Sequence, residues 1–333
     1  MVLSSGALLV VDVFLLVVGT LVLYWGAAWL IKGSGSIARA FGVKPLVVGL
    51  TVVAYANSAP ELAVATNTAL AHSQPIALGT VIGSCAANLS LILGLTALIK
   101  PPTVDGRIIR REAPVLIGSA IAVPLLLRNG VLSRLEGVLL IACAVVFTIA
   151  TLTVSAREED AIENDAAARA EQAGAEAGGK ARPNESRLVA ALKTALGIVL
   201  VLAGTQLFVR GGRGIGASLG MSERMLGLTV IALGTALPEL VASLIAALRG
   251  QSSLAIGGVI GSNLMNVFLV LGVTAYLRPI RLGERMHVVD LVGLVAITLL
   301  AVLVLRGSRR ITRLEGALLV AAYIAFVICS ATL

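Results

Sequence analysis

The chain has 333 residues, of which 58% are hydrophobic and only 13% are charged, and its mean hydropathy is +0.98. Soluble domains carry about 25% charged residues, so the composition excludes a soluble protein, a disordered chain and a disulfide scaffold. The net charge of +8 does not indicate a nucleic-acid partner. Lysine and arginine occur instead in short gaps between apolar runs, as in the loops of membrane proteins.

Ten segments are apolar and long enough to cross a bilayer, which takes about 20 residues in a helix. In chain order they are 6–31, 45–70, 75–99, 113–127, 135–155, 188–209, 225–248, 253–277, 288–305 and 314–331. The first is too long for a signal peptide, and no lysine or arginine precedes it, so we expect a retained helix. The predicted fold class is all-α, a polytopic membrane protein with ten transmembrane helices.

Ten spans place both termini on the same side of the membrane. With the termini outside, 18 lysines and arginines fall in the inner loops and 8, Arg224 among them, in the outer loops. Because inner loops carry an excess of positive residues, we expect a cell-membrane protein with both termini outside.

A hydrophilic stretch, 156–187, interrupts the apolar pattern with a run of acidic residues. It predicts three units: a five-helix unit at 1–155, an acidic cytoplasmic linker at 156–187 with helix at 157–173, and a second five-helix unit at 188–333. A solvated tether is favoured over a calcium sensor, because the acidic run lacks the ligand spacing of an EF-hand loop.

The two five-helix units resemble each other in sequence. With a shift of 178 residues, 49–97 aligns on 227–275 without a gap, and 22 of the 49 positions are identical. SRLEGVLL at 133–140 aligns with TRLEGALL at 312–319 at a shift of 179. Because five spans is an odd number, two such units must have opposite orientations, which predicts an inverted repeat of the kind that secondary transporters use.

Two glutamates, Glu61 and Glu239, occupy equivalent positions inside apolar segments of the two units. A charged group at the centre of a membrane helix costs about 3 kcal/mol on insertion scales, and no lysine or arginine lies at a matching depth. Each glutamate follows a proline, Pro60 or Pro238, which removes a helical hydrogen bond and frees carbonyl oxygens one turn earlier. A surface helix end would explain one Pro–Glu pair, but two in a repeat indicate a buried cation site with broken helices two and seven.

Further oxygen-bearing residues share faces with these glutamates at helical spacing. Asn57 and Thr235 stand four residues before their glutamates, and Ser58 stands three before Glu61. The following segments carry hydroxyl and amide groups four residues apart: Ser84, Asn88, Ser262 and Asn266. Two bidentate carboxylates and backbone carbonyls supply about six oxygens, within the 6–8 that Ca²⁺ takes. Zinc and copper are disfavoured because no histidine or cysteine accompanies the glutamates.

At NSAPEL with GSCAAN, and GTALPEL with GSNLMN, the chain resembles the paired repeats of the sodium/calcium exchanger family, within the cation/Ca²⁺ antiporter superfamily, in its prokaryotic ten-helix form. The resemblance covers the whole chain. It implies that Glu61 and Glu239 bind the ions, that helices one and six slide to alternate access, and that no cofactor is needed. It also implies that the backbones of Asn57 and Thr235 hold Ca²⁺, that the hydroxyls and amides line the pocket, and that Ser58 and the carbonyls of Ala54 and Ala232 form flanking Na⁺ sites.

Two positions depart from the family pattern GTSxPE: Asn57 stands where threonine is common, and Ala236 where serine is common. The missing hydroxyl at Ala236 weakens one flanking Na⁺ site, so a related branch that exchanges Ca²⁺ for protons is the alternative. Asn266, where potassium-dependent relatives tend to have aspartate, disfavours K⁺ coupling.

The primary hypothesis is a secondary antiporter that exchanges Ca²⁺ for Na⁺ and functions as a monomer. An intramembrane metal-dependent enzyme is disfavoured, because the sequence lacks a nucleophile with an adjacent base and a histidine-containing metal motif. A passive cation channel is a further alternative, which single-channel currents without coupling would favour.

Overall fold

The computed structural model describes residues 5–40, 55, 58–104, 106–173, 186–248, 250, 252–282, 288–307 and 310–332. In the first half the elements are α1 (Ser5–Ala40), α4 (Ala59–Leu70), α5 (Gln74–Ala86), η2 (Ala87–Ile92), α6 (Leu93–Ile99), α7 (Gly106–Leu126), η3 (Leu127–Asn129), β1 (Val131–Leu132) and α8 (Arg134–Ala173). In the second half they are α9 (Arg187–Ser218), α10 (Glu223–Leu226), η4 (Gly227–Ile231), α11 (Ala232–Thr235), α12 (Leu237–Leu248), α13 (Ser252–Met265), η5 (Asn266–Leu271), α14 (Gly272–Leu277), β2 (Ile280–Arg281), α15 (Val288–Gly307) and α16 (Arg313–Thr332).

Eight helices in the described part of the chain are long and apolar enough to cross a membrane. The pair Glu223–Thr235 and Leu237–Leu248, bent by 41°, makes nine if it counts as one span. These nine coincide with nine of the segments predicted from the sequence. The other predicted segment, 45–70, lies partly outside the described residues, and α4 is its C-terminal part. The total of ten therefore stays a prediction.

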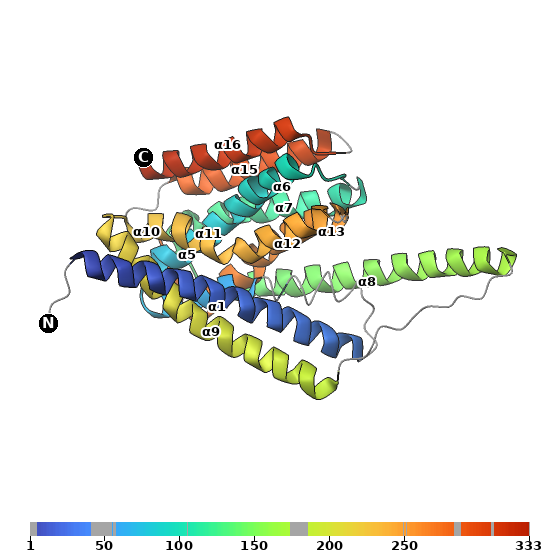
Figure 1. Ribbon diagram of the computed structural model, residues 1–333. Coiled ribbons are helices and arrows are strands. Elements are labelled where there is room, and N and C mark those ends of the chain that lie inside the picture. Colours follow the sequence, from blue (N-terminus) through green and yellow to red (C-terminus); the bar gives the residue numbers. More distant parts are fainter. Residues whose placement is uncertain are drawn as a thin grey trace.

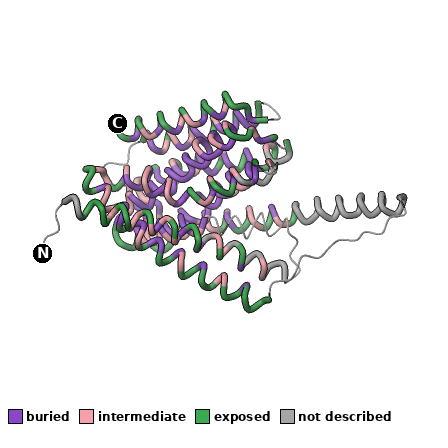
Figure 2. The backbone as a smooth tube through the Cα atoms, in the orientation of Figure 1, coloured by how far each residue is buried: buried purple, intermediate pink, exposed green. Residues whose placement is uncertain are grey.

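The bundle has an inner and an outer set of helices. The span α5–η2–α6 is 94% buried and the span ending in α14 is 72% buried, whereas only 11% of the span in α1 is buried. Figure 2 shows the buried residues concentrated along the middle of the bundle. A helix that is apolar on all sides suits both the protein core and the lipid, so contacts with neighbouring helices decide which helices are central.

Equivalent positions in the two halves make equivalent contacts. A helix, a π-helical turn and a second helix follow each other in α5–η2–α6 and again in α13–η5–α14. Gly94 lies against Gly316, and their equivalents Gly272 and Gly137 lie against each other. The sulfhydryl of Cys85 contacts the carbonyl oxygen of Asn263 at 3.9 Å, and these two residues are themselves equivalent at the shift of 178.

The short strand pairings are also equivalent in the two halves. Val131 pairs with Arg281 in the antiparallel ladder of β1 and β2, and the isolated bridge joins Thr103 to Arg310. The bridge is the counterpart of the ladder at shifts of 178 and 179. These pairings join the end of each central span to the loop before the last helix of the other half.

Helices α1 and α9 lie side by side along one edge of the bundle (Figure 1). Glycines recur every seven residues on both, and a Cβ at any of these positions would collide with the partner backbone. Residue numbers rise along α1 as they fall along α9, so the two equivalent helices are antiparallel. The pairs in register are Gly19 with Phe208, Gly26 with Val201, Gly33 with Thr194, Leu30 with Gly197, Leu23 with Gly204 and Leu16 with Gly211.

The segment predicted as a linker begins as helix. Helix α8 runs without a break from Arg134 to Ala173, so the helix expected at 157–173 is the continuation of the preceding span. Its start is fixed by a capping box. The backbone N–H of Ser133 donates to Glu136 at 2.7 Å, and the N–H of Glu136 donates to the Ser133 hydroxyl at 3.3 Å.

Candidate functional site

Both glutamates lie in the first turn of a short helix whose second residue is a proline. Helix α4 begins Ala59–Pro60–Glu61 after Ser58, and α12 begins Leu237–Pro238–Glu239 after Ala236. Proline is tolerated there because the first N–H groups of a helix have no intrahelical acceptor. The positive end of the helix dipole also favours a carboxylate in this turn. The break predicted at Pro238 is present as the 41° bend.

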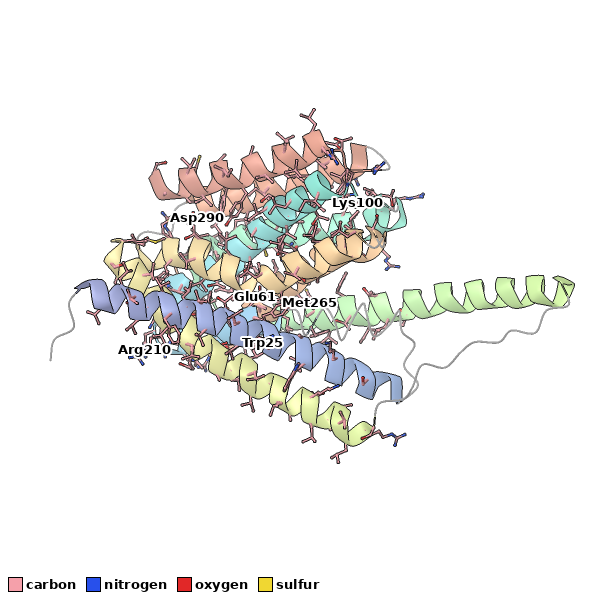
Figure 3. The ribbon with its side chains drawn as sticks, viewed as in Figure 1. Trp25, Glu61, Lys100, Arg210, Met265 and Asp290 are labelled. Carbon is pink, nitrogen blue, oxygen red and sulfur yellow. The ribbon has the colours of Figure 1, made fainter. Side chains whose placement is uncertain are left out.

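The two carboxyl groups are fully enclosed. Glu61 is 0% exposed and Glu239 is 2% exposed. Figure 3 places Glu61 in the middle of the bundle. All four carboxyl oxygens lack a hydrogen-bond partner among the described residues. Buried polar groups in proteins are nearly always paired, so this pair of acids needs a separate explanation.

Four of the other residues predicted for the site share this condition. Each is 0% exposed, and its polar atoms have no hydrogen-bond partner within the described ranges; they are Ser58, Asn88, Ser262 and Asn266. The site helices contact the opposite half of the molecule: α4 packs against η5, and α12 packs against η2. The helix of Glu61 therefore meets the π-helical turn that begins at Asn266, and the helix of Glu239 meets the turn that contains Asn88.

A set of hydroxyl contacts joins α5 to the break in the second half. The hydroxyl of Thr235 donates to the carbonyl oxygen of Ala232 at 3.2 Å. The Ser84 hydroxyl lies 3.5 Å from the same carbonyl oxygen and 3.4 Å from the Thr235 hydroxyl. Gly83 makes this approach possible, because a Cβ there would collide with the carbonyl of Leu228. The backbone carbonyl of Ala232 thus faces a side chain of the other half.

Nine of the eleven predicted site residues are described, and all nine are buried; the other two, Ala54 and Asn57, lie outside the described residues. Within the described chain, no cluster of three or more histidine, cysteine, aspartate or glutamate residues could hold a metal. The donors are two carboxylates, two amides, hydroxyls and a carbonyl. Such oxygen sets suit hard cations such as Ca²⁺ and do not suit zinc or copper.

Comparison with known proteins decides the family. The sodium/calcium exchanger protein family matches residues 11–153 and 189–332, which is most of the chain. The chain belongs to the sodium/calcium exchanger family. Its relatives include the putative antiporter CaxA of Alkalimonas amylolytica, 37% identical over 96% of this chain and 98% of the relative. The sodium/calcium exchanger MaX1 of Methanosarcina acetivorans is 28% identical over 96% of this chain and 99% of the relative.

Solved structures agree with this assignment. The sodium-calcium exchanger NCX_Mj, soaked with Na⁺ and Ca²⁺, superposes with a TM-score of 0.67 and is 31% identical, covering 97% of this chain and 98% of that chain. The prediction of the family from the two motif pairs is therefore confirmed. Members of the sodium/calcium exchanger family are membrane antiporters rather than enzymes.

One buried charged pair was not expected from the sequence pattern. Arg224 was counted with the outer-loop cations, but it is only 8% exposed, and its guanidinium donates to both carboxyl oxygens of Asp290 at 2.8 and 2.7 Å. It also donates to the backbone carbonyl of Ser330 at 2.5 Å. The detectable signal was Asp290 itself, an acid in the first turn of the apolar segment 288–305. The pair joins the start of the seventh predicted span to the last two helices.

Proposed function

We propose that the chain exchanges Ca²⁺ for Na⁺ across the cell membrane by alternating access, with one midplane site built on Glu61 and Glu239. The observation that carries the proposal is the cluster of buried carboxyl, amide and hydroxyl groups without partners among the described residues. A cation is the partner that such groups lack. Because two carboxylates carry two negative charges, one divalent ion balances them.

The coupling of the two fluxes follows from a shared site. The same carboxylates take Ca²⁺ or Na⁺, so the ions bind in turn rather than together. The Ser58 hydroxyl, which has no partner among the described residues, and the carbonyl of Ala232, which now accepts from Thr235 and from the Ala236 N–H, would hold flanking Na⁺ ions. Around the Ca²⁺ position would lie Thr235, Ser84, Asn88, Ser262 and Asn266. If three Na⁺ move for each Ca²⁺, one net charge crosses, which is worth about 2.3 kcal/mol per 100 mV.

Alternating access is supported by the antiparallel register of α1 and α9. Equivalent helices that run in opposite directions are what an inverted repeat requires, and the paired contacts of Gly94 and Gly272 fit the same arrangement. The α1–α9 pair has close internal contacts and a largely exposed surface, which suits a unit that slides along a fixed core. We propose ten spans, both termini outside, and a monomer as the working unit.

Proton coupling is the second candidate, and Ala236 is the observation that favours it. This residue is 2% exposed and stands beside the break that carries Glu239, so a methyl group occupies the place of a possible Na⁺ ligand. Two glutamates can carry protons without any further ligand. Whether Na⁺ or H⁺ is the counter-ion therefore depends on how tightly the remaining oxygen ligands bind Na⁺.

The test is isotopic calcium flux into vesicles that contain the purified chain. Separate Na⁺, K⁺ and H⁺ gradients are imposed, and uptake that follows the Na⁺ gradient is expected. Calcium uptake that ignores Na⁺ and follows the pH gradient would replace Na⁺ by H⁺ in the proposal. Single-channel calcium currents without any counter-ion dependence would overturn antiport altogether.

A further inference from the structure

We propose that Tyr55 and Thr148 are positioning residues that hold the first site helix for ion binding, an inference that rests on the proposed function. The Tyr55 hydroxyl and the Thr148 hydroxyl lie 2.7 Å apart in a partly buried position. Tyr55 precedes Ser58 by three residues and Glu61 by six. The contact therefore holds Tyr55, which precedes α4 by four residues, against α8.

The direction of this hydrogen bond is determined by its neighbour. The Thr148 hydroxyl donates to the carbonyl oxygen of Ala144 at 2.7 Å. A threonine hydroxyl has only one hydrogen, so Tyr55 donates and Thr148 accepts. The result is a chain of two bonds that ends on the backbone of α8, which gives the tyrosine a fixed acceptor.

Helix α8 is itself held against the second half of the molecule. Gly137 lies against the backbone of Gly272 and Tyr276, and Leu140 and Ile141 lie against Gly272 in turn. Helix α8 also packs against η5, the π-helical turn that begins at the buried Asn266. The Tyr55–Thr148 bond thus connects a residue six positions before Glu61 to α8, the helix that packs against the turn beginning at Asn266. Through this connection, the bond sets the positions of Glu61 and Asn266, two predicted ion ligands, relative to each other.

The second half shows that the fold itself does not need this bond. At the shifts of 178 and 179, the equivalents of Tyr55 and Thr148 are Leu233 and Val327, and both are apolar side chains packed against the core. In that half the break carries a local bond instead, from the hydroxyl of Thr235 to the carbonyl of Ala232 three residues earlier. The equivalent of Thr235 is Asn57, so the first half has an amide where the second has this hydroxyl.

The experiment is a double-mutant cycle with Tyr55→Phe, Thr148→Val and the double variant. Both substitutions remove only the bonding groups, and a valine already occupies the position equivalent to Thr148. Equilibrium Ca²⁺ binding to the purified chain and calcium flux in vesicles are measured. Each single variant should raise the half-saturating Ca²⁺ concentration about threefold to tenfold, the range that one hydrogen bond supports, and leave the maximal flux unchanged. The double variant should match the single ones, because all three lose the same bond.

Thr153→Val is the matched control. Thr153 lies on the same helix, is exposed, and donates only to the carbonyl of Ala150. The half-saturating Ca²⁺ concentration of the Thr153→Val variant should therefore stay at the wild-type value. Additive effects in the double variant, or a lower melting temperature with unchanged Ca²⁺ binding, would overturn the positioning role. A wild-type chain that binds Ca²⁺ without exchanging it contradicts the proposed function, and the binding cycle still decides the role of Tyr55. A wild-type chain that binds no Ca²⁺ overturns both.

Discussion

The cluster around Glu61 and Glu239 and the α1–α9 pair differ in what fills their interiors. The cluster is enclosed by the most buried helices and contains carboxyl and amide groups without partners among the described residues. The α1–α9 pair has a backbone contact made possible by six glycines, and much of its remaining surface is exposed. An unpaired buried polar group costs about 1–3 kcal/mol, whereas close packing through glycine stabilises helix association in membranes. The unpaired groups thus lower stability at the proposed ion site, whereas the glycine contact raises it where two helices pack together.

The largest effect is expected from Glu61→Gln or Glu239→Gln. Either variant removes one of the two charges that balance a divalent ion, so calcium flux should fall to background. The melting temperature of the chain in detergent, measured without Ca²⁺, should not fall, because a neutral amide is cheaper to bury than a carboxylate. Glu315→Gln is the control: Glu315 is a half-buried cap of α16 that accepts from the Thr312 backbone N–H, and its variant should retain flux. Full flux in either site variant would contradict the site assignment.

Variants at the α1–α9 contact should lose stability and keep Ca²⁺ binding, which is the reverse of the glutamate variants. Gly26→Ala and Gly204→Ala place a methyl group against the backbones of Val201 and Leu23, and overpacking of this kind costs about 1–3 kcal/mol. We expect a lower melting temperature, and we expect roughly tenfold less flux because about 1.4 kcal/mol of the same clash adds to the barrier for helix sliding. Equilibrium Ca²⁺ binding should be retained, since none of the predicted ligands lies on these helices. Gly118→Ala, at an exposed glycine with no neighbour within 4 Å, should change neither quantity. Lost Ca²⁺ binding in the α1 or α9 variants would mean that the two regions are not separable.

A smaller effect is expected at the amides. Asn88→Ala and Asn266→Ala each remove one neutral oxygen ligand, so the half-saturating Ca²⁺ concentration should rise about tenfold, as for the loss of one strong polar contact. Asn263→Ala is the matched control. Asn263 is also buried, but its amide donates to the carbonyl of Val259 in its own helix at 3.0 Å. Equal losses at all three positions would indicate a general packing defect instead of ligand removal.

The positions of the apolar spans and the equivalence of the two halves could be predicted from the sequence. Apolar length located nine described spans, and the alignment of the two Pro–Glu motifs picked out residues that the structure shows to be buried. The sequence did not reveal the Arg224–Asp290 pair, because a positive-inside count treats every arginine near a helix end as solvated. The Tyr55–Thr148 bond was also invisible, since the two residues are 93 positions apart and neither has a polar equivalent in the other half. Such asymmetric contacts depend on which helices meet, and spacing along one helix does not contain that information.

The smallest change tests the counter-ion. Ala236→Ser adds one hydroxyl beside the break that carries Glu239, at a position that is 2% exposed. If Na⁺ drives transport and lacks only this ligand, the Na⁺ concentration for half-maximal calcium flux should fall about fivefold, equivalent to roughly 1 kcal/mol for one added polar contact. Ala247→Ser, at a buried alanine further along the same helix, controls for a hydroxyl placed elsewhere. A gain of Na⁺ dependence in a chain that otherwise follows pH would show that a single oxygen selects between the two counter-ions. An unchanged Na⁺ requirement would mean that Ala236 does not face the ions, and that the oxygens around Glu61 and Glu239 already suffice.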